Sequence, residues 1–188
     1  DIAVELAGGG QSIKIIDNRS VRPLSDPPKA TYKKGSGISL FSKRQIPADY
    51  IKAKAQAGQM HFILLAIAVK THRGIEFFIP DKKDIEALEK AKKALGVKKA
   101  EWERENIIPV EEFPIISTDP RPILYGMPLW TDMFTPRQLL SIGTISEHLK
   151  KNRTEIINTE GEKEGNAIIH LLAFTLDKFL SQLHAHKI

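Results

Sequence analysis

The 188-residue sequence contains no cysteine, which excludes a disulfide framework, a cysteine nucleophile and every thiolate zinc site. This absence favours a reducing, cytoplasmic location. Long apolar runs are also missing: the longest, residues 62–69, is far shorter than the roughly 20 residues that cross a bilayer. Residues 1–10 lack the basic start and apolar stretch of a signal peptide. We therefore expect no membrane contact. Asp1 stands where an initiating Met would, which is consistent with a fragment or with a processed piece.

Acidic residues are scarce in the first part of the chain. The whole sequence has 28 Lys+Arg, 23 Asp+Glu and a net charge of +5. Residues 1–75 hold 12 Lys+Arg against 5 Asp+Glu, a net of +7, and residues 76–188 hold 16 against 18, a net of −2. A basic first part followed by a near-neutral remainder indicates a polyanionic partner, of which nucleic acid is the first candidate. A solvated basic surface without a partner remains an equal alternative.

Residues 1–46 carry few strong patterns. A β-branched run at residues 12–16 predicts a short strand, and residues 38–41 could form another. The prolines and the K-K-G-S-G stretch at residues 33–37 are typical of a loop. This region predicts little regular structure.

Stronger signals follow. Pro47 and Gly58 bracket an alanine-rich run, residues 48–57, which predicts a helix. Two stretches rich in Ile, Val, Phe and Leu come next, at residues 61–71 and 74–80. The turn-like sequence between them predicts a β-hairpin.

A long helix is expected to begin at Asp81. Asp84 stands three residues later, in the position that a capping box requires. The apolar residues that follow recur with helical spacing, and Gly96 predicts the end of the helix. The pattern is that of an amphipathic surface helix.

Residues 107–134 contain five prolines, which exclude a regular helix and predict an extended linker. Thr135 as N-cap and Pro136 in the first helical position then predict a helix that ends near residue 151. Its expected inward-facing residues are Leu139, Ile142, Ile145 and Leu149.

A polar stretch at residues 152–165 separates that helix from a last one, at about residues 166–183. The last helix is apolar nearly all round, so we expect burial on more than one of its sides. Together the elements predict an α+β fold, with an antiparallel hairpin or small sheet flanked by about four helices. The expected segments are a basic α+β part (1–106), a Pro-rich linker (107–134) and an antiparallel C-terminal helix pair (135–188).

Two short motifs invite a catalytic interpretation. Amino-methyltransferases use an Asp/Asn-Pro-Pro-aromatic loop to hold the target amino group, and Asp26-Pro27-Pro28 is followed instead by Lys29, which cannot stack as a ring does. We interpret it as a Pro-rich turn. The glycine triplet at residues 8–10 lacks the spacing and flanking elements of a phosphate loop, and indicates a flexible loop.

Histidines give no clear metal site. His184 and His186 stand two residues apart at the tail, with no nearby carboxylate or third histidine. His170 lies in the apolar last helix, where a core or interface histidine is expected. We therefore predict no metal site.

Five basic residues surround the predicted alanine-rich helix and the hairpin turn. If they converge, they would neutralise phosphates and give salt-dependent binding to DNA. Tyr50, on the same helix, could stack on a base, although packing is the favoured interpretation. The candidate DNA-binding residues are Lys43, Arg44, Lys52, Lys54 and Arg73.

Two stretches resemble a known family. They are residues 46–60, IPADYIKAKAQAGQM, and residues 125–140, which contain Tyr125-Gly-Met and WTDMFTPRQLL. Both are similar to the middle segment of large prokaryotic adenine-specific DNA methylases, often archaeal, that also carry a domain of unknown function. Residues 171–180 are similar to the helix that follows there, so the resemblance covers about residues 38–180.

The departures from that family limit what the resemblance implies. Many members have a Cys-x-x-Cys knuckle before the Ile-Pro-Ala-Asp segment, and residues 39–45 contain no cysteine, so zinc is not implied. The family's S-adenosylmethionine loop lies upstream and its catalytic Asp-Pro-Pro-Tyr loop downstream. Neither matches residues of this chain, so no catalytic or cofactor residue is assigned, and S-adenosylmethionine is implied only for the parent enzyme.

The resemblance implies a non-catalytic region of a DNA adenine-N6 methyltransferase that assists DNA binding or target recognition. Its partners would be DNA and the remaining catalytic part of that enzyme. One alternative is a structural or interaction module that assembles or dimerises through the last helix without touching DNA. Another is a small enzyme with a dispersed site, which requires a deep pocket with convergent polar groups.

Overall fold

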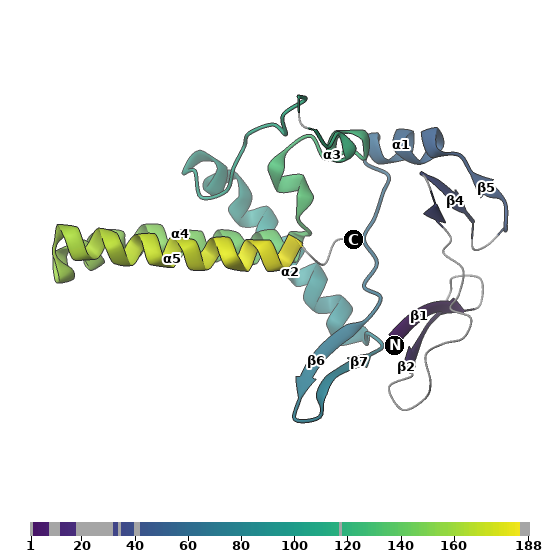
Figure 1. Ribbon diagram of the computed structural model, residues 1–188, viewed down its shortest axis with the longest axis horizontal. Helices are drawn as coiled ribbons and strands as arrows, with labels where there is room; N and C mark the ends of the chain where they lie inside the picture. The colour runs from purple at the N-terminus through teal and green to yellow at the C-terminus, as the bar shows by residue number, and fades with distance from the viewer. Residues whose placement is uncertain are drawn as a thin grey trace. The chain divides into compact units, whose positions relative to one another are not determined.

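The computed structural model describes residues 2–7, 12–17, 32–33, 35–39, 42–116 and 118–184. The glycine triplet, the Asp26–Lys29 segment and the His184/His186 pair of side chains lie outside this description. The architecture is α+β with a C-terminal helix pair, as the sequence predicts (Figure 1).

The chain divides into two compact units. The N-terminal unit comprises Asp1–Glu86 together with Leu124–Gly126, and the C-terminal unit comprises Ala87–Ile123 and Met127–Ile188. Each unit is described by itself below. The division at residues 106 and 134 expected from the sequence stays a prediction.

Small antiparallel sheets make up much of the N-terminal unit. The predicted strand at residues 12–16 is confirmed, and it pairs with a preceding strand so that Val4 lies opposite Ile15. The expected loop at residues 33–37 is wrong: two strands meet there, because Gly35 adopts a φ of +84° that allows a tight turn. The strands are β1 (Ile2–Ala7), β2 (Ser12–Asp17), β3 (Tyr32–Lys33), β4 (Ser36–Ile38) and β5 (Gln45–Ile46).

Helix α1 (Ala48–Gln56) follows β5 directly and confirms the helix predicted between Pro47 and Gly58. Ala57 closes its last turn, and Gly58 leaves the helix with a φ of +68°. Because β5 pairs with β4 and α1 packs against β4, the loop between these strands and the helix form one connected piece.

The predicted hairpin is also confirmed, with a first strand shorter than expected. It consists of β6 (Ile67–Thr71) and β7 (Gly74–Phe78), and Thr71 pairs with Gly74 across the turn. The Thr71 hydroxyl closes the turn, because it donates to the Gly74 carbonyl at 3.0 Å and accepts the Arg73 N–H at 3.2 Å. Residues 61–66 form no strand.

Helix α2 (Lys82–Arg104) begins as predicted and ends later than predicted. Asp81 and Asp84 exchange side-chain to backbone hydrogen bonds of 2.9 and 3.0 Å, which confirms the capping box. The expected stop at Gly96 is wrong. A single glycine inside a helix costs only about 1 kcal/mol relative to alanine, and the packing of Leu95 and Trp102 in the core offsets it.

The helix ends at a Schellman motif. Asn106 takes a left-handed φ of +53°, and the Ile107 N–H donates back to the Trp102 carbonyl at 2.8 Å. Trp102 and Ile107 are both buried, at 1% and 8% exposure. The same turn therefore ends the helix and places two apolar side chains in the core of the C-terminal unit. That core comprises Leu95, Trp102, Ile107, Ile108 and Leu139.

The Pro-rich stretch is more structured than an extended linker. It contains the short helix α3 (Arg121–Leu124) and the 3-10 helix η2 (Trp130–Met133), so it is not extended throughout, although the sequence predicts an extended linker. Glu112 and Leu129 form a β-bridge, and the rings of Phe113 and Trp130 meet with centroids 4.7 Å apart. Proline is disfavoured inside a long helix but is tolerated in a first turn, and Pro122 lies in the first turn of α3.

The C-terminal helices are α4 (Pro136–Glu160) and α5 (Glu162–His184), which pack along each other as an antiparallel pair (Figure 1). The Thr135 cap is confirmed, since its hydroxyl accepts the Gln138 N–H at 3.4 Å. The polar break expected at residues 152–165 is wrong. The two helices are joined at Gly161, whose φ is +83°.

Packing explains why the polar segment stays helical. A β-carbon at Gly165 would lie 2.8 Å from the Ile157 Cα, so the absence of a side chain there lets the two helices approach closely. Contact with α5 stabilises a segment whose own sequence is weakly helical. In the described part of the chain, no helix has the length and apolarity needed to span a membrane.

Candidate nucleic-acid interface

Lys43 and Arg44 lie in the tight loop between β4 and β5. The loop closes through the Lys43 N–H to the Ser39 carbonyl and the Ser39 N–H to the Arg44 carbonyl, both 2.9 Å, and the Ser39 hydroxyl accepts the Ser42 N–H at 3.1 Å. Lys43 adopts a φ of +57°, a region in which a residue with a β-carbon is strained. Both basic side chains are exposed at the tip.

Lys52 and Lys54 lie on α1 and point to different sides of it, because positions two apart on a helix are separated by about 200°. Lys52 lies 3.8 Å from the Asp49 carboxylate, whose side chain is 99% exposed, so this ion pair is weak. The Lys54 ammonium lies 5.5 Å from the centre of the Tyr50 ring. Tyr50 itself is 56% exposed, so its ring is not buried by packing, although packing is the interpretation that the sequence favours.

Arg73 lies in the turn of the β6–β7 hairpin and is exposed, together with Lys70 and His72. It belongs to a different sheet from the loop that carries Lys43 and Arg44. The structure therefore brings the 43–44 loop and α1 into one connected piece and leaves Arg73 on a separate element of the same unit.

Residues 42–75 contain six basic residues and one acidic residue. The structure describes this stretch throughout, and Asp49 is the acidic residue. Apart from the Lys52–Asp49 contact, none of these cations forms an ion pair with a residue that the structure describes. Residues 42–75 therefore carry a net charge of +5, which ion pairs within the described part of the chain scarcely reduce. The cations are Lys43, Arg44, Lys52, Lys54, Lys70 and Arg73.

Two tyrosines that the sequence did not single out as binding residues meet in the same unit. The hydroxyls of Tyr32, on β3, and Tyr125, after α3, lie 2.6 Å apart. Ninety-three positions separate them, so no local pattern indicates the contact. Lys52 is close enough for its charge to lower the pKa of Tyr32, against a larger increase from the Tyr125 hydrogen bond.

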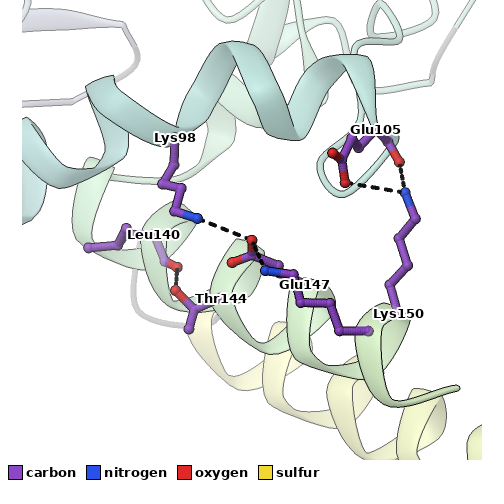
Figure 2. Close-up of polar contacts among 7 residues, drawn as sticks. Lys98, Glu105, Leu140, Thr144, Glu147 and Lys150 are labelled. Carbon is purple, nitrogen blue, oxygen red and sulfur yellow. Dashed lines mark hydrogen bonds and ion pairs between the residues drawn. The ribbon is translucent and has the colours of Figure 1, made fainter. Parts of the chain in front are cut away.

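The C-terminal unit holds a carboxylate with a strongly shifted pKa (Figure 2). Glu147 on α4 accepts hydrogen bonds from Lys151 at 2.8 Å and from Lys98 on α2 at 3.1 Å. These bonds lower the pKa of Glu147 to about 2. A carboxylate that stays ionised at neutral pH cannot serve there as a general acid, so its role is to join the two helices. Beside it, Lys150 reaches the backbone carbonyl of Glu105.

Metal binding finds no support in the described residues. They contain no group of three or more His, Asp or Glu side chains arranged to hold an ion. His170 is exposed on α5, so it is not a core histidine, and the alternative of an interface histidine stays a prediction.

Comparison with known proteins adds no assignment. Neither a protein-family model, nor a curated protein, nor a solved structure matches this chain.

Proposed function

We propose that this chain is a non-catalytic region of an S-adenosylmethionine-dependent DNA adenine-N6 methyltransferase, where it helps to hold or select the DNA target. The observation that carries the proposal is the charge of residues 42–75, with six cations and one carboxylate on exposed loops, a short helix and strand β6. Phosphate contacts from Lys and Arg supply much of the affinity of DNA-binding proteins, and such a surface can make them.

The resemblance to adenine-specific DNA methylases points to the same surface. Its first motif, residues 46–60, covers the end of β5 and all of α1, and so includes Lys52 and Lys54. The second motif has a structural explanation. The Asp132 carboxylate accepts the Leu129 N–H at 2.9 Å, and Thr135 caps α4. The first motif therefore offers the better place for contact with a partner.

The reaction itself is assigned to the rest of the parent enzyme. S-adenosylmethionine and the groups that hold the target adenine would belong to that catalytic part. We expect this chain alone, mixed with the cofactor and DNA, to transfer no methyl group. Robust methylation under those conditions would contradict the proposal.

Salt dependence of DNA binding tests the proposal directly. About five phosphate contacts should weaken binding by roughly 10²–10³ between about 50 and 200 mM salt. The measurement is fluorescence anisotropy of a labelled duplex with the full chain. Absent binding, or binding indifferent to salt, would contradict a phosphate-contacting surface.

Charge reversal locates the contacts. The double variant Lys52→Glu/Lys54→Glu should weaken binding and reduce the slope of log affinity against log salt by about 2. The matched control is Lys90→Glu/Lys92→Glu, which changes net charge equally with the same spacing on exposed positions of α2. Equal losses in both variants would show a general charge effect instead of a surface at α1.

A second function is favoured by a different observation. On α5, Leu171 and Phe174 lie three positions apart and are 66% and 71% exposed. Such an apolar face suits a structural or interaction module that assembles or dimerises without DNA. That function predicts a stable oligomer in sedimentation that Phe174→Glu disrupts, with no affinity for the duplex.

A further inference from the structure

Two phenols from separate parts of the chain meet in the N-terminal unit, next to helix α1, which carries Lys52 and packs against β4. Tyr32 comes from β3, Lys52 from α1 and Tyr125 from the turn that follows α3. The two phenolic oxygens lie 2.6 Å apart, which is the distance of a strong O–H···O hydrogen bond. The charge of Lys52 acts on the Tyr32 phenol.

The position of Tyr125 is fixed by the backbone beside it. Gly126 has a φ of +72°, and a β-carbon there would lie 2.2 Å from the carbonyl oxygen of Ala55. The Gln56 side-chain amide donates to the Leu124 carbonyl at 3.4 Å. The turn at residues 124–126 is thus held against the C-terminal end of α1, the helix that also carries Lys52.

The contact between the two phenols leaves one O–H proton able to donate to another group. Two phenols share one proton in their mutual bond, so the accepting phenol keeps its own O–H proton to donate elsewhere. Tyr32 is 50% exposed, and a third of the Lys52 side chain is accessible. The hydrogen bond with Tyr125 raises the pKa of Tyr32, so Tyr32 remains a protonated phenol at neutral pH.

The two phenols and Lys52 therefore offer an O–H donor near a positive charge. Among biological groups, a phosphate oxygen suits this pair best, and Tyr and Lys side chains are regular phosphate contacts in DNA complexes. The competing carboxylate, Asp49, lies 3.8 Å from Lys52 and is almost fully exposed, so it holds the lysine weakly.

We propose that Tyr32, Tyr125 and Lys52 bind one backbone phosphate of DNA. The inference rests on the proposed function and adds to it a particular subsite. It assigns a binding role to two neutral residues that charge alone does not identify.

The test compares single variants of the full chain for binding to a short labelled duplex at several salt concentrations. Tyr125→Phe removes a donor without changing charge, so affinity should fall about five- to tenfold with an unchanged salt slope. Lys52→Gln should weaken binding and reduce the slope by about 1. Asp49→Asn should do the opposite and tighten binding, because it releases Lys52.

Tyr50→Phe is the matched control. Tyr50 is an exposed tyrosine on the same helix, and its ring contact with Lys54 does not need the hydroxyl. Loss of the Tyr50 hydroxyl should leave the affinity for the duplex unchanged. If Tyr125→Phe proves unstable in thermal denaturation, Tyr32→Phe replaces it, since it removes the other phenolic oxygen of the pair and should weaken binding with an unchanged salt slope.

The outcomes separate this inference from the broader function. If the wild-type chain binds no duplex, both fail. If it binds, and Tyr125→Phe and Lys52→Gln behave like Tyr50→Phe, the subsite is wrong and the DNA-binding function stands. Inorganic phosphate distinguishes the source of the ligand. The binding measurements are repeated with millimolar inorganic phosphate present. If wild type then still binds the duplex, but wild type and Tyr125→Phe no longer differ in affinity, the subsite holds free phosphate, and the assignment to a DNA phosphate is overturned.

Discussion

A β-carbon at Gly143 would lie 2.2 Å from Cζ3 of the Trp102 ring. Gly143 is on α4 and Trp102 on α2, and Trp102 is 1% exposed. The missing side chain is therefore what allows the indole to lie flush against α4. This contact fixes the spacing of the two helices in the core of the C-terminal unit.

Replacement of Gly143 should destabilise the protein although alanine is the better helix former. Gly143→Ala should lower the free energy of unfolding by about 1–3 kcal/mol, because a rigid, fully buried ring must move. Gly96→Ala is the control, since Gly96 is within α2 and a β-carbon added there would meet no atom within 4 Å outside the helix's own neighbouring backbone. That variant should raise stability by about 0.5–1 kcal/mol in urea denaturation. A Gly143→Ala protein as stable as wild type would contradict the tight contact.

Gly126, in the N-terminal unit, also occupies a position where a side chain would clash with a neighbouring atom. Gly126→Ala and Gly58→Ala both place a β-carbon at positive φ, of +72° and +68°, but only the first meets the Ala55 carbonyl. Gly58→Ala should cost about 1 kcal/mol, and Gly126→Ala about 1–3 kcal/mol more. Alkaline titration of tyrosine absorbance provides a second measurement. The pKa of Tyr32 should fall toward its ordinary value in Gly126→Ala, because the Tyr125 hydrogen bond is the main cause of its increase.

Glu147 should make the stability of the chain depend on acidity. Its two lysine partners lower its pKa from an ordinary 4.5 to about 2 in the folded state. A lowered carboxylate pKa stabilises the fold above the unfolded-state value, and this contribution disappears as pH falls through the folded-state value. Thermal denaturation should therefore show Glu147→Gln melting below wild type at neutral pH, with the gap closing between about pH 4.5 and 2.

Glu155→Gln, at an exposed position of the same helix, is the control for that series. It should melt close to wild type throughout. A constant gap between wild type and Glu147→Gln down to the lowest pH would show that the loss comes from packing and not from charge.

Lys43 should trade stability against binding. Its φ of +57° strains a residue with a β-carbon, so Lys43→Gly should stabilise the protein by about 0.5–1 kcal/mol. The same change removes a cation and should lower the salt slope of DNA binding by about 1. Arg44→Gly removes the neighbouring charge from a position without positive φ, so it should weaken binding without raising stability. Unaltered DNA affinity in both variants would remove the loop from the interface.

Features that depend on a few neighbouring residues were predictable from the sequence. The Asp81–Asp84 and Thr135–Gln138 caps form as expected, because the bonding partners are three residues apart. The basic residues were also identifiable, since charge and helix position can be read directly.

Features that depend on distant contacts were not predictable. Glycine often ends a helix, so the local sequence predicts a stop at Gly96. The helix continues because Leu95 and Trp102 pack on residues far along the chain. Residues 152–160 read as polar and irregular until α5 is placed against them. The Tyr32–Tyr125 contact has no counterpart in local sequence at all.

The return of Leu124–Gly126 to the N-terminal unit has a consequence for synthesis and for dissection of the chain. The ribosome must deliver the intervening polypeptide before α1 can receive the tripeptide that covers its C-terminal end. A truncation after Glu86 would leave a half that lacks Tyr125 and Gly126, however intact its own strands. The polypeptide thus crosses the boundary between the units more than once, and a truncation at Glu86 does not separate two complete units.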